Sequence, residues 1–335
     1  MAHSNYLKII TNYQDEIAKI DDIILDYSKN KSPLIQDICQ HLINSGGKRI
    51  RPILLIICAK LQNIEINNQI LNLAAAIEMI HSATLLHDDV VDNSQTRRNQ
   101  KTANAIWDNK ASILVGDYVF AISFILMVKS DNIKALELLA KTASIMADGE
   151  VMQLENSSNI NIDIDQYLKI INGKTAILFA SAASISALLN VKTAKNHNKL
   201  HEFGLNLGVI FQIIDDILDY KANIDNLGKD IGDDFFEGKV TLPLILLMQK
   251  ANKEDKNKIS QIHLKNLAQN LTSKENNNNL EYILKLFAKY QIFDDSFALA
   301  KKYYHKCLKI LENFDNNRHK EELTTIINYS FSRLS

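Results

Sequence analysis

Two aspartate-rich segments contain the residues of this sequence best suited to chemistry. Each has two aspartates spaced four apart, namely Asp88 and Asp92 in the first and Asp215 and Asp219 in the second. On a helix, residues four apart lie one turn apart on the same face, so each pair presents two carboxylates together. Carboxylates without clustered Cys or His select Mg²⁺, with Mn²⁺ as a substitute, over zinc. The sequence therefore predicts metal ions held by these four aspartates, with phosphate oxygens completing the metal shell.

A single acidic segment of this kind is more often a solvated helix face. Here, however, each segment ends a strongly apolar stretch, 77–86 before the first and 207–214 before the second. Two such copies with basic partners favour a site for diphosphate over a solvated surface. Asp89 and Asp216 are rotated by about 100° from the paired aspartates and suit structural roles.

Basic residues accompany both aspartate segments. After the flexible Gly46-Gly47 turn, three cations stand at a predicted helix start, where backbone amides also favour anions. They are Lys48, Arg49 and Arg51. Each of the other cations, taken alone, is typical of a solvated surface, but together they suffice for two diphosphates. These other cations are Arg97, Arg98, Lys174, Lys229 and Lys239.

Two further patterns lead into the aspartate segments and leave alternatives open. His81 stands two turns before Asp88 on the same face, where it could donate to a phosphate or simply pack in the core. Gly204, Gly208 and Gln212 share a face that leads into the second segment. Small residues there permit the close approach of a substrate or of another helix, and helix packing is as good an interpretation.

The elements that position these residues are predicted to be helices. The chain has 335 residues, of which 46% are hydrophobic, with only 10 Gly and 3 Pro. That scarcity favours long helices with few breaks, and no strand alternation is visible. The apolar periodicity predicts helices at 5–28, 34–44, 52–62, 68–93, 103–109, 111–129, 132–155, 165–189, 196–220 and 240–251, two more within 280–334, and loops at 156–164, 190–198, 222–238 and 272–279. We expect one all-α domain over residues 1–335.

Composition excludes several classes of function. A formal net charge of −1 argues against nucleic acid as a partner. Cys39, Cys58 and Cys307 form no CxxC pair and are predicted to be reduced packing residues. The apolar stretch 111–128 approaches transmembrane length, but Asp117 in its middle favours a buried core helix. The N-terminus is polar, so we expect a cytoplasmic protein without a transmembrane segment.

Several motifs between residues 46 and 245 resemble those of the trans-isoprenyl diphosphate synthases, and within them the long-chain bacterial polyprenyl diphosphate synthases. They are GKRIRP at 47–52, IHSATLLHDDVVD at 80–92, LVGDY at 114–118, GEV at 149–151, KTA at 174–176, FQIIDDILDY at 211–220 and GKVTLP at 238–243. The C-terminal part carries a much weaker resemblance. One departure is Asn99, where the family usually has Gly, and Asn tolerates the left-handed backbone.

The resemblance implies an isoprenoid synthase fold, in which antiparallel helices surround a deep central cavity, and usually a homodimer. It implies that Mg²⁺ is held on the allylic diphosphate by Asp88, Asp92 and Asp215. It assigns the allylic diphosphate to Arg97, Lys174, Thr175, Gln212, Lys229 and Lys239. It assigns isopentenyl diphosphate to Lys48, Arg51, His81 and Arg98. The residues expected to act in the chemical step are Asp88, Asp92, Arg97, Lys174, Asp215 and Lys239.

The reaction that the resemblance implies condenses an allylic diphosphate, such as farnesyl diphosphate, with successive molecules of isopentenyl diphosphate. Metals and cations would stabilise the departing diphosphate, and apolar helix faces would exclude water from the allylic cation. The isopentenyl double bond would then attack, and the proton would pass to the released diphosphate. The product would be a long all-trans polyprenyl diphosphate for a quinone side chain, whose greasy chain could keep the enzyme near a membrane.

Product length should depend on how far an apolar tunnel runs beneath Asp88. Ala83 and Thr84 lie one helical turn below it, about 5.4 Å down, and both side chains are small. A growing chain could therefore pass that level, whereas an aromatic side chain would block it. The positions farther down this face and the candidates for the floor on the neighbouring helix are Ile80, Leu136 and Leu139.

Four alternatives remain. A terpene cyclase would need no isopentenyl site, and Lys48, Arg51 and His81 argue against it. A non-catalytic partner subunit would typically lose one metal segment, whereas both are intact here. A shorter-chain synthase would share the chemistry but not the tunnel. A helical metal-sensing or scaffold protein would not need the ordered basic motifs.

Overall fold

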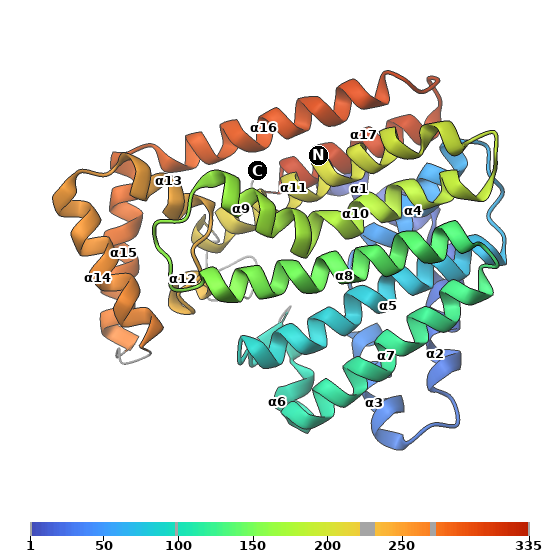
Figure 1. Ribbon diagram of the computed structural model, residues 1–335, viewed down its shortest axis with the longest axis horizontal. Helices are drawn as coiled ribbons and strands as arrows, with labels where there is room; N and C mark the ends of the chain where they lie inside the picture. Colours follow the sequence, from blue (N-terminus) through green and yellow to red (C-terminus); the bar gives the residue numbers. More distant parts are fainter. Residues whose placement is uncertain (1, 98–99, 222–231, 269–272, 334–335) are drawn as a thin grey trace.

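The protein is almost wholly helical in the computed structural model, which describes residues 2–97, 100–221, 232–268 and 273–333 (Figure 1). The all-α prediction is therefore confirmed. The α-helices are α1 (Ala2–Asn12), α2 (Gln14–Ser28), α3 (Pro33–Asn44), α4 (Ile50–Leu61), α5 (Asn68–Val91), α6 (Ala103–Trp107), α7 (Asn109–Lys129), α8 (Ile133–Asn156), α9 (Ile164–Ile171), α10 (Ile177–Ser184), α11 (His197–Lys221), α12 (Asp233–Phe236), α13 (Leu242–Lys250), α14 (Lys253–Leu267), α15 (Ser273–Lys289), α16 (Ile292–Leu311) and α17 (Arg318–Phe331).

Short elements of other types interrupt this pattern. A π-helical turn, η1 (Asn172–Ala176), joins α9 to α10, and two 3₁₀ turns, η2 (Ile185–Leu189) and η3 (Ala194–Asn196), follow α10. Two strands, β1 (Thr96–Arg97) and β2 (Gln100–Lys101), pair antiparallel with Thr96 opposite Lys101. This small hairpin directly follows the first aspartate segment and was not predicted from the sequence.

Polar side chains fix where the central helices begin. The Asn67 side chain accepts a hydrogen bond from Ile70 N at 3.1 Å at the start of α5, and Asn132 accepts from Ala135 N at 2.9 Å at the start of α8. Asp163 does the same for α9, accepting from Gln166 N at 2.8 Å. Such caps satisfy amides that a helix leaves unpaired at its first turn.

The core lies around α4, α5, α10 and α11, and α7 packs along the outer side of α5. Helix α16 runs along one edge of the molecule over α11, while α8 packs against α10 and α7 (Figure 1). Helices α14 and α15 lie at one end of the molecule, and α13 connects them to the main bundle by packing against α16 and α11 (Figure 1). The three cysteines are buried and unpaired, as the sequence predicts.

Several predicted boundaries are wrong. The helix predicted at 5–28 is two helices that break at Tyr13, where φ is −115° and ψ is 17°. The helix predicted at 165–189 is interrupted by η1 and ends in a 3₁₀ turn. The loop predicted at 272–279 is helical from Ser273 onward, and the loop predicted at 222–238 contains α12. The region 280–334 holds most of α15 as well as α16 and α17, which is one helix more than expected.

Three helical stretches of the described residues are long and apolar enough to cross a membrane, namely Asn68–Val91, Asn109–Lys129 and Ile164–Leu189. Within the most apolar 18 residues of each stretch, 67%, 50% and 83% are buried inside the protein, respectively. The sequence predicted that 111–128 is a buried core helix, whereas only half of this stretch is buried. Helix α7 packs against α5 on one side and leaves an apolar stripe exposed on the other.

Candidate active site

The first aspartate segment lies at the C-terminal end of α5. Asp88 is in the last helical turn, and Asp92 is the residue that caps it, with its backbone N–H donating to Asp88 O at 2.8 Å. Their side chains are 20% and 21% exposed, respectively. The helix therefore presents both carboxylates at a half-buried position, as the four-residue spacing predicts.

Two of the predicted cations meet these carboxylates. Lys174 Nζ lies 3.9 Å from Asp88 Oδ2, and Lys239 Nζ lies 2.8 Å from Asp92 Oδ2. Each lysine also contacts an acidic residue that sequence reasoning missed. Lys174 Nζ is 2.7 Å from Glu150 Oε2, and Lys239 Nζ is 2.7 Å from Glu237 Oε2. The structure thus gathers residues from α5, α8, η1 and the segment after α12 around one point.

The charges at this point perturb one another. Burial raises the pKa of Asp88, and the neighbouring Asp92 raises it further, while Lys174 opposes the shift. For Lys239, burial lowers the pKa, but the surrounding carboxylates of Asp234, Asp92 and Glu237 outweigh it, so the pKa is raised. The carboxylates around this point therefore outnumber the two lysines that pair with them.

A close contact between two glycines places Lys174. A Cβ atom on Gly149 of α8 would lie 2.5 Å from the backbone N of Lys174 and 2.8 Å from the carbonyl carbon of Gly173. Only glycine lets α8 approach η1 this closely. The π-helical turn carries Lys174 and Thr175, and such turns are frequent at functional sites. The GEV and KTA motifs of the sequence are therefore one structural unit.

Glycines on α11 have the same role on the opposite side of η1. A Cβ on Gly208 would lie 2.5 Å from Ala176 Cα, and one on Gly204 would lie 2.3 Å from Phe179 O. Sequence reasoning left open whether these glycines admit a substrate or another helix. The contacts show that they admit the backbone of η1 and α10.

The second aspartate segment lies in the last turns of α11. Asp215 is 43% exposed at its side chain, and its Oδ1 accepts a hydrogen bond from Arg333 Nη2 at 3.0 Å. The Arg333 guanidinium stacks 4.5 Å from the ring centre of Phe211. The backbone carbonyl of Asp219 accepts from Gly232 N at 2.9 Å. Arg333, two residues from the C-terminus, was not predicted to reach this site.

Among the described residues, no three His, Cys, Asp or Glu side chains converge as a ready-made metal site. The aspartates are paired with cations instead, since Lys174, Lys239 and Arg333 lie against Asp88, Asp92 and Asp215. The available donors are carboxylate oxygens, which fit Mg²⁺ or another hard divalent ion rather than zinc. The side chains of Asp88, Asp92 and Asp215 are 20%, 21% and 43% exposed, respectively, so each carboxylate is accessible from solvent.

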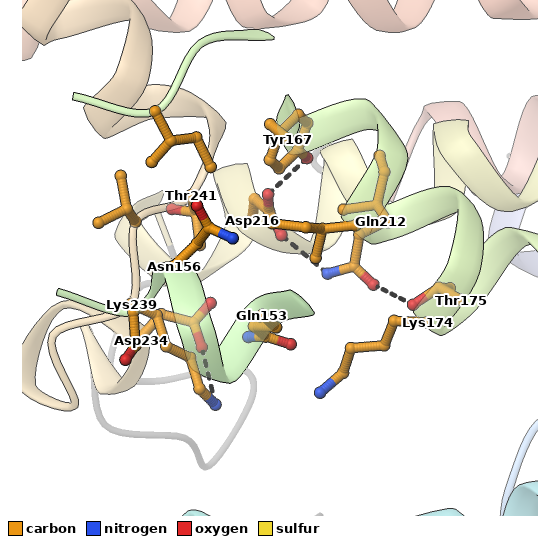
Figure 2. A pocket seen from close by; sticks show the side chains of 15 residues that line it. Gln153, Asn156, Tyr167, Lys174, Thr175, Gln212, Asp216, Asp234, Lys239 and Thr241 are labelled. Atoms are coloured by element: carbon orange, nitrogen blue, oxygen red, sulfur yellow. Dashed lines mark hydrogen bonds and ion pairs between the residues drawn. The ribbon is translucent and has the colours of Figure 1, made fainter. Parts of the chain in front are cut away.

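Asp216 has the structural role that its rotation on the helix predicts. It is 2% exposed and accepts hydrogen bonds from Tyr167 Oη at 2.6 Å and from Gln212 Nε2 at 2.8 Å (Figure 2). Thr175 Oγ1 in turn donates to Gln212 Oε1 at 2.8 Å. Burial raises the pKa of Asp216 to about 7, with a further contribution from Asp234. Asp89 is also buried, and both Nε and Nη2 of Arg97 lie 2.8 Å from its Oδ1.

A cavity of about 120 Å³ lies beside this hydrogen-bonded group. Figure 2 shows polar side chains of Gln153, Asn156 and Thr241 facing it, together with Lys174 and Lys239 at its edge. The cavity therefore joins the two lysines to the buried Asp216.

The basic turn before α4 supplies cations of two kinds. Lys48 is exposed, with Nζ 5.0 Å from the ring centre of Tyr329, and the Arg51 guanidinium lies 4.4 Å from that of Phe179. Arg49 differs, because its guanidinium is buried between Glu78 Oε1 at 2.7 Å and Asp21 Oδ1 at 3.1 Å. The resemblance assigned Lys48 and Arg51, but not Arg49, to a diphosphate, and in the structure Arg49 pairs with these two carboxylates.

The remaining predicted residues are placed as follows. His81 is half-buried on α5, and its backbone carbonyl accepts a hydrogen bond from Thr84 Oγ1 at 2.8 Å. Thr84 is partly exposed. Among the positions of the predicted tunnel, Ala83, Ile80 and Leu139 are buried, and Leu136 packs against the core. The tunnel itself stays a prediction. Arg98, Asn99 and Lys229 lie outside the described residues.

Comparisons with known proteins agree with this arrangement. Residues 32–286 match the family model described as polyprenyl synthetase. Octaprenyl diphosphate synthase of Escherichia coli (strain K12) is 40% identical over 250 residues, which are 75% of this chain and 77% of that protein. The crystal structure of a decaprenyl diphosphate synthase from Rhodobacter capsulatus is similar, with a TM-score of 0.90 and 33% identity over 98% of this chain and 99% of that chain.

A second solved structure contains ligands. A polyprenyl synthase from Caulobacter crescentus CB15, complexed with calcium and isoprenyl diphosphate, has a TM-score of 0.89 to this chain at 36% identity. The match covers 98% of each chain. That relative therefore holds a divalent ion and a prenyl diphosphate on the same fold.

Proposed function

Because this chain belongs to the polyprenyl synthetase family, we propose that its product is octaprenyl diphosphate. The chain is a trans-prenyltransferase that makes a long all-trans polyprenyl diphosphate from an allylic diphosphate and isopentenyl diphosphate. The observation that carries the proposal is the 40% sequence identity with the octaprenyl diphosphate synthase of Escherichia coli over three quarters of the chain. We further propose farnesyl diphosphate as the allylic primer and a quinone, such as ubiquinone, as the acceptor of the finished chain.

The allylic diphosphate is proposed to lie between the two aspartate segments. Mg²⁺, held by Asp88 and Asp92 with Asp215 and Asp219 opposite, would supply positive charge to the departing diphosphate. With those carboxylates neutralised, Lys174 and Lys239 would be released to pair with diphosphate oxygens. The other residues proposed to contact this diphosphate are Arg97, Thr175, Gln212 and Lys229.

Isopentenyl diphosphate is proposed to bind at the basic turn before α4. Lys48 lies in that turn, Arg51 lies in the first turn of α4, and His81 lies on the neighbouring helix α5. Arg98 is the fourth predicted contact. The proton is proposed to leave with the released diphosphate, so that no protein base is needed.

Chain length is proposed to depend on the face of α5 below Asp88. In a Thr84→Phe variant, an aromatic ring would enter one turn beneath the site and stop the growing chain early. Ala83 is buried, so Ala83→Phe should act in the same direction but with a greater loss of stability. Unchanged product length in both variants would contradict this placement of the tunnel.

We propose that the protein is a homodimer formed through α7. The exposed face of this helix contains Leu114, Ile125 and Val128, which are 67%, 45% and 65% exposed, respectively. Contiguous apolar patches of this kind mark interaction surfaces. We also propose a cytoplasmic location, because α7 is proposed to face a second copy of the chain. Peripheral membrane association is proposed for release of the product, because the product is strongly apolar.

The decisive experiment is a product analysis. The purified protein would be incubated with Mg²⁺, farnesyl diphosphate and labelled isopentenyl diphosphate, and the dephosphorylated alcohols separated by reversed-phase chromatography. A dominant octaprenol band is expected. A shorter alcohol would keep the chemistry and refute the octaprenyl product. No elongation would instead favour a cyclase or a partner-dependent subunit, and a matched Asp88→Asn variant would control for contaminating activity.

A further inference from the structure

Tyr167 is a buried residue that the sequence did not single out, yet it contacts the group next to the proposed diphosphate site. It lies on α9 and is 3% exposed. Its hydroxyl donates to Asp216 Oδ2 at 2.6 Å, and Asp216 lies beside Asp215 in the second aspartate segment (Figure 2). A phenol buried this deeply normally needs such a partner, so burial alone leaves open whether the contact serves only stability.

The hydrogen bonds beyond Asp216 run in one direction. The Gln212 amide has a donor end and an acceptor end. Because Gln212 Nε2 donates to Asp216 Oδ1 at 2.8 Å, its Oε1 must face the other way. There it accepts the hydroxyl proton of Thr175 at 2.8 Å. The position of the Asp216 carboxylate therefore determines how Gln212 and Thr175 are oriented.

Packing alone does not hold Asp216 in this position. Asp216 lines the cavity of about 120 Å³, together with Tyr167, Thr175 and Gln212. A carboxylate beside open space can rotate or admit water unless hydrogen bonds fix it. Besides Gln212, the donors to Asp216 are Tyr167 Oη and, at the longer distance of 3.5 Å, Leu242 N.

We propose that Tyr167 is a positioning residue of the allylic diphosphate subsite, acting through Asp216 and Gln212 on Thr175 and the adjoining Lys174. The proposal rests on the proposed function, since it assigns Thr175 and Lys174 to that diphosphate. Tyr167 itself does not touch the substrate. Its hydroxyl keeps the hydrogen-bonded group in the one arrangement that leaves the π-helical turn ready for the diphosphate.

The chain offers a matched control for the loss of a buried phenol hydroxyl. Tyr13 is 2% exposed, and its Oη donates to the buried carboxylate of Glu322 at 2.6 Å. This contact ties the junction of α1 and α2 to α17 and involves none of the residues proposed to bind substrate. Tyr13→Phe and Tyr167→Phe therefore remove the same kind of hydrogen bond, one away from the site and one beside it.

The test compares steady-state kinetics of the wild type and these two variants, with farnesyl and isopentenyl diphosphate varied in turn. Tyr167→Phe should raise KM for farnesyl diphosphate by about tenfold and leave KM for isopentenyl diphosphate within about twofold. Tyr13→Phe should lower thermal stability to a similar degree and change neither KM. Loss of stability in Tyr167→Phe with both KM values unchanged would overturn the proposal, and so would an equal rise of both.

A binding measurement removes the dependence on turnover. Titration of inorganic diphosphate in the presence of Mg²⁺, followed by calorimetry, should show weaker binding to Tyr167→Phe than to the wild type or Tyr13→Phe. In Gln212→Leu, the further substitution Tyr167→Phe should have little additional effect, because Tyr167 acts through Gln212. Fully additive losses would show that it acts by another route. If the wild type fails to elongate farnesyl diphosphate, the proposed function fails. If the wild type is active and Tyr167→Phe has the same KM values and the same diphosphate affinity, only this inference is refuted.

Discussion

Arg49 and its neighbours Lys48 and Arg51 look alike in sequence but differ in what surrounds them. Arg49 has a left-handed backbone, with φ at 43°, and its side chain is only 10% exposed. The guanidinium connects Asp21 on α2 to Glu78 on α5, and thereby ties the basic turn to two helices. Arg49 therefore anchors the turn that carries Lys48 and leads into α4, where Arg51 lies.

Removal of this anchor should be costly. Arg49→Met would leave the carboxylates of Glu78 and Asp21, which are 7% and 24% exposed, without their cation. We expect a loss of about 3–5 kcal/mol in the free energy of unfolding, measured by urea denaturation. Lys141→Met is the control, because the exposed Lys141–Glu137 pair should contribute less than about 1 kcal/mol. Similar losses in both variants would mean that the Arg49 contacts contribute little.

Side chains that share one helix could be placed from the sequence, whereas partners from distant segments could not. The four-residue spacing correctly predicted that Asp88 and Asp92 lie on one face, because the helical period fixes it. No local pattern indicates that Glu150 pairs with Lys174 or that Arg333 reaches Asp215. Those contacts depend on how α8, α11 and the C-terminal segment pack in three dimensions.

At the scale of elements, the helical periodicity predicted most helices but missed the interruption that matters most for the site. The residues before and after η1 continue an apolar pattern, so five residues of π-helical turn are not distinguishable from α-helix in the sequence. At this turn Gly173 meets Gly149 of α8, with Gly149 Cα only 3.1 Å from where a Gly173 Cβ would lie. Such a tertiary contact cannot be inferred from sequence periodicity.

The fit between α8 and η1 leads to a prediction at Gly149. Gly149→Ala would place a methyl group against the backbone of Gly173 and Lys174, and neither can move without shifting η1. We expect a loss of about 1–3 kcal/mol in stability and a fall of at least about tenfold in kcat/KM for the allylic substrate, measured by denaturation and steady-state kinetics. Ala147→Gly, at an exposed position of the same helix, should cost about 1 kcal/mol and leave activity unchanged. Full activity in Gly149→Ala would show that the lysine does not depend on this contact.

At the scale of the whole molecule, helices α1 and α17 meet beside Lys48, close to the proposed substrate sites. Tyr6 of α1 stacks on Tyr329 of α17 with ring centres 4.2 Å apart, and Tyr6 Oη donates to Lys48 O at 2.6 Å. Arg333 then reaches Asp215. The C-terminal part therefore takes part in the candidate site, although its sequence motifs are weak.

The exposed stripe on α7 gives the last prediction, which concerns assembly. Leu114 and Val128 are about two-thirds exposed on a helix whose other side is buried against α5. If a second copy covers this stripe, Leu114→Glu and Val128→Glu would each bury a charge without a partner, which an interface rarely tolerates. We expect both variants to sediment as monomers at concentrations where the wild type is a dimer.

Val191 provides the matched control for this experiment, because it is 94% exposed and lies outside the α7 stripe. Val191→Glu should leave the sedimentation coefficient unchanged. A monomeric wild type, or dimers that persist in both α7 variants, would exclude the stripe as the interface. Helix α7 packs on α5, whose last turn carries Asp88 and Asp92, so loss of the dimer should also lower activity by loosening that packing. Monomers with full activity would show instead that each copy holds its aspartates without help from the other.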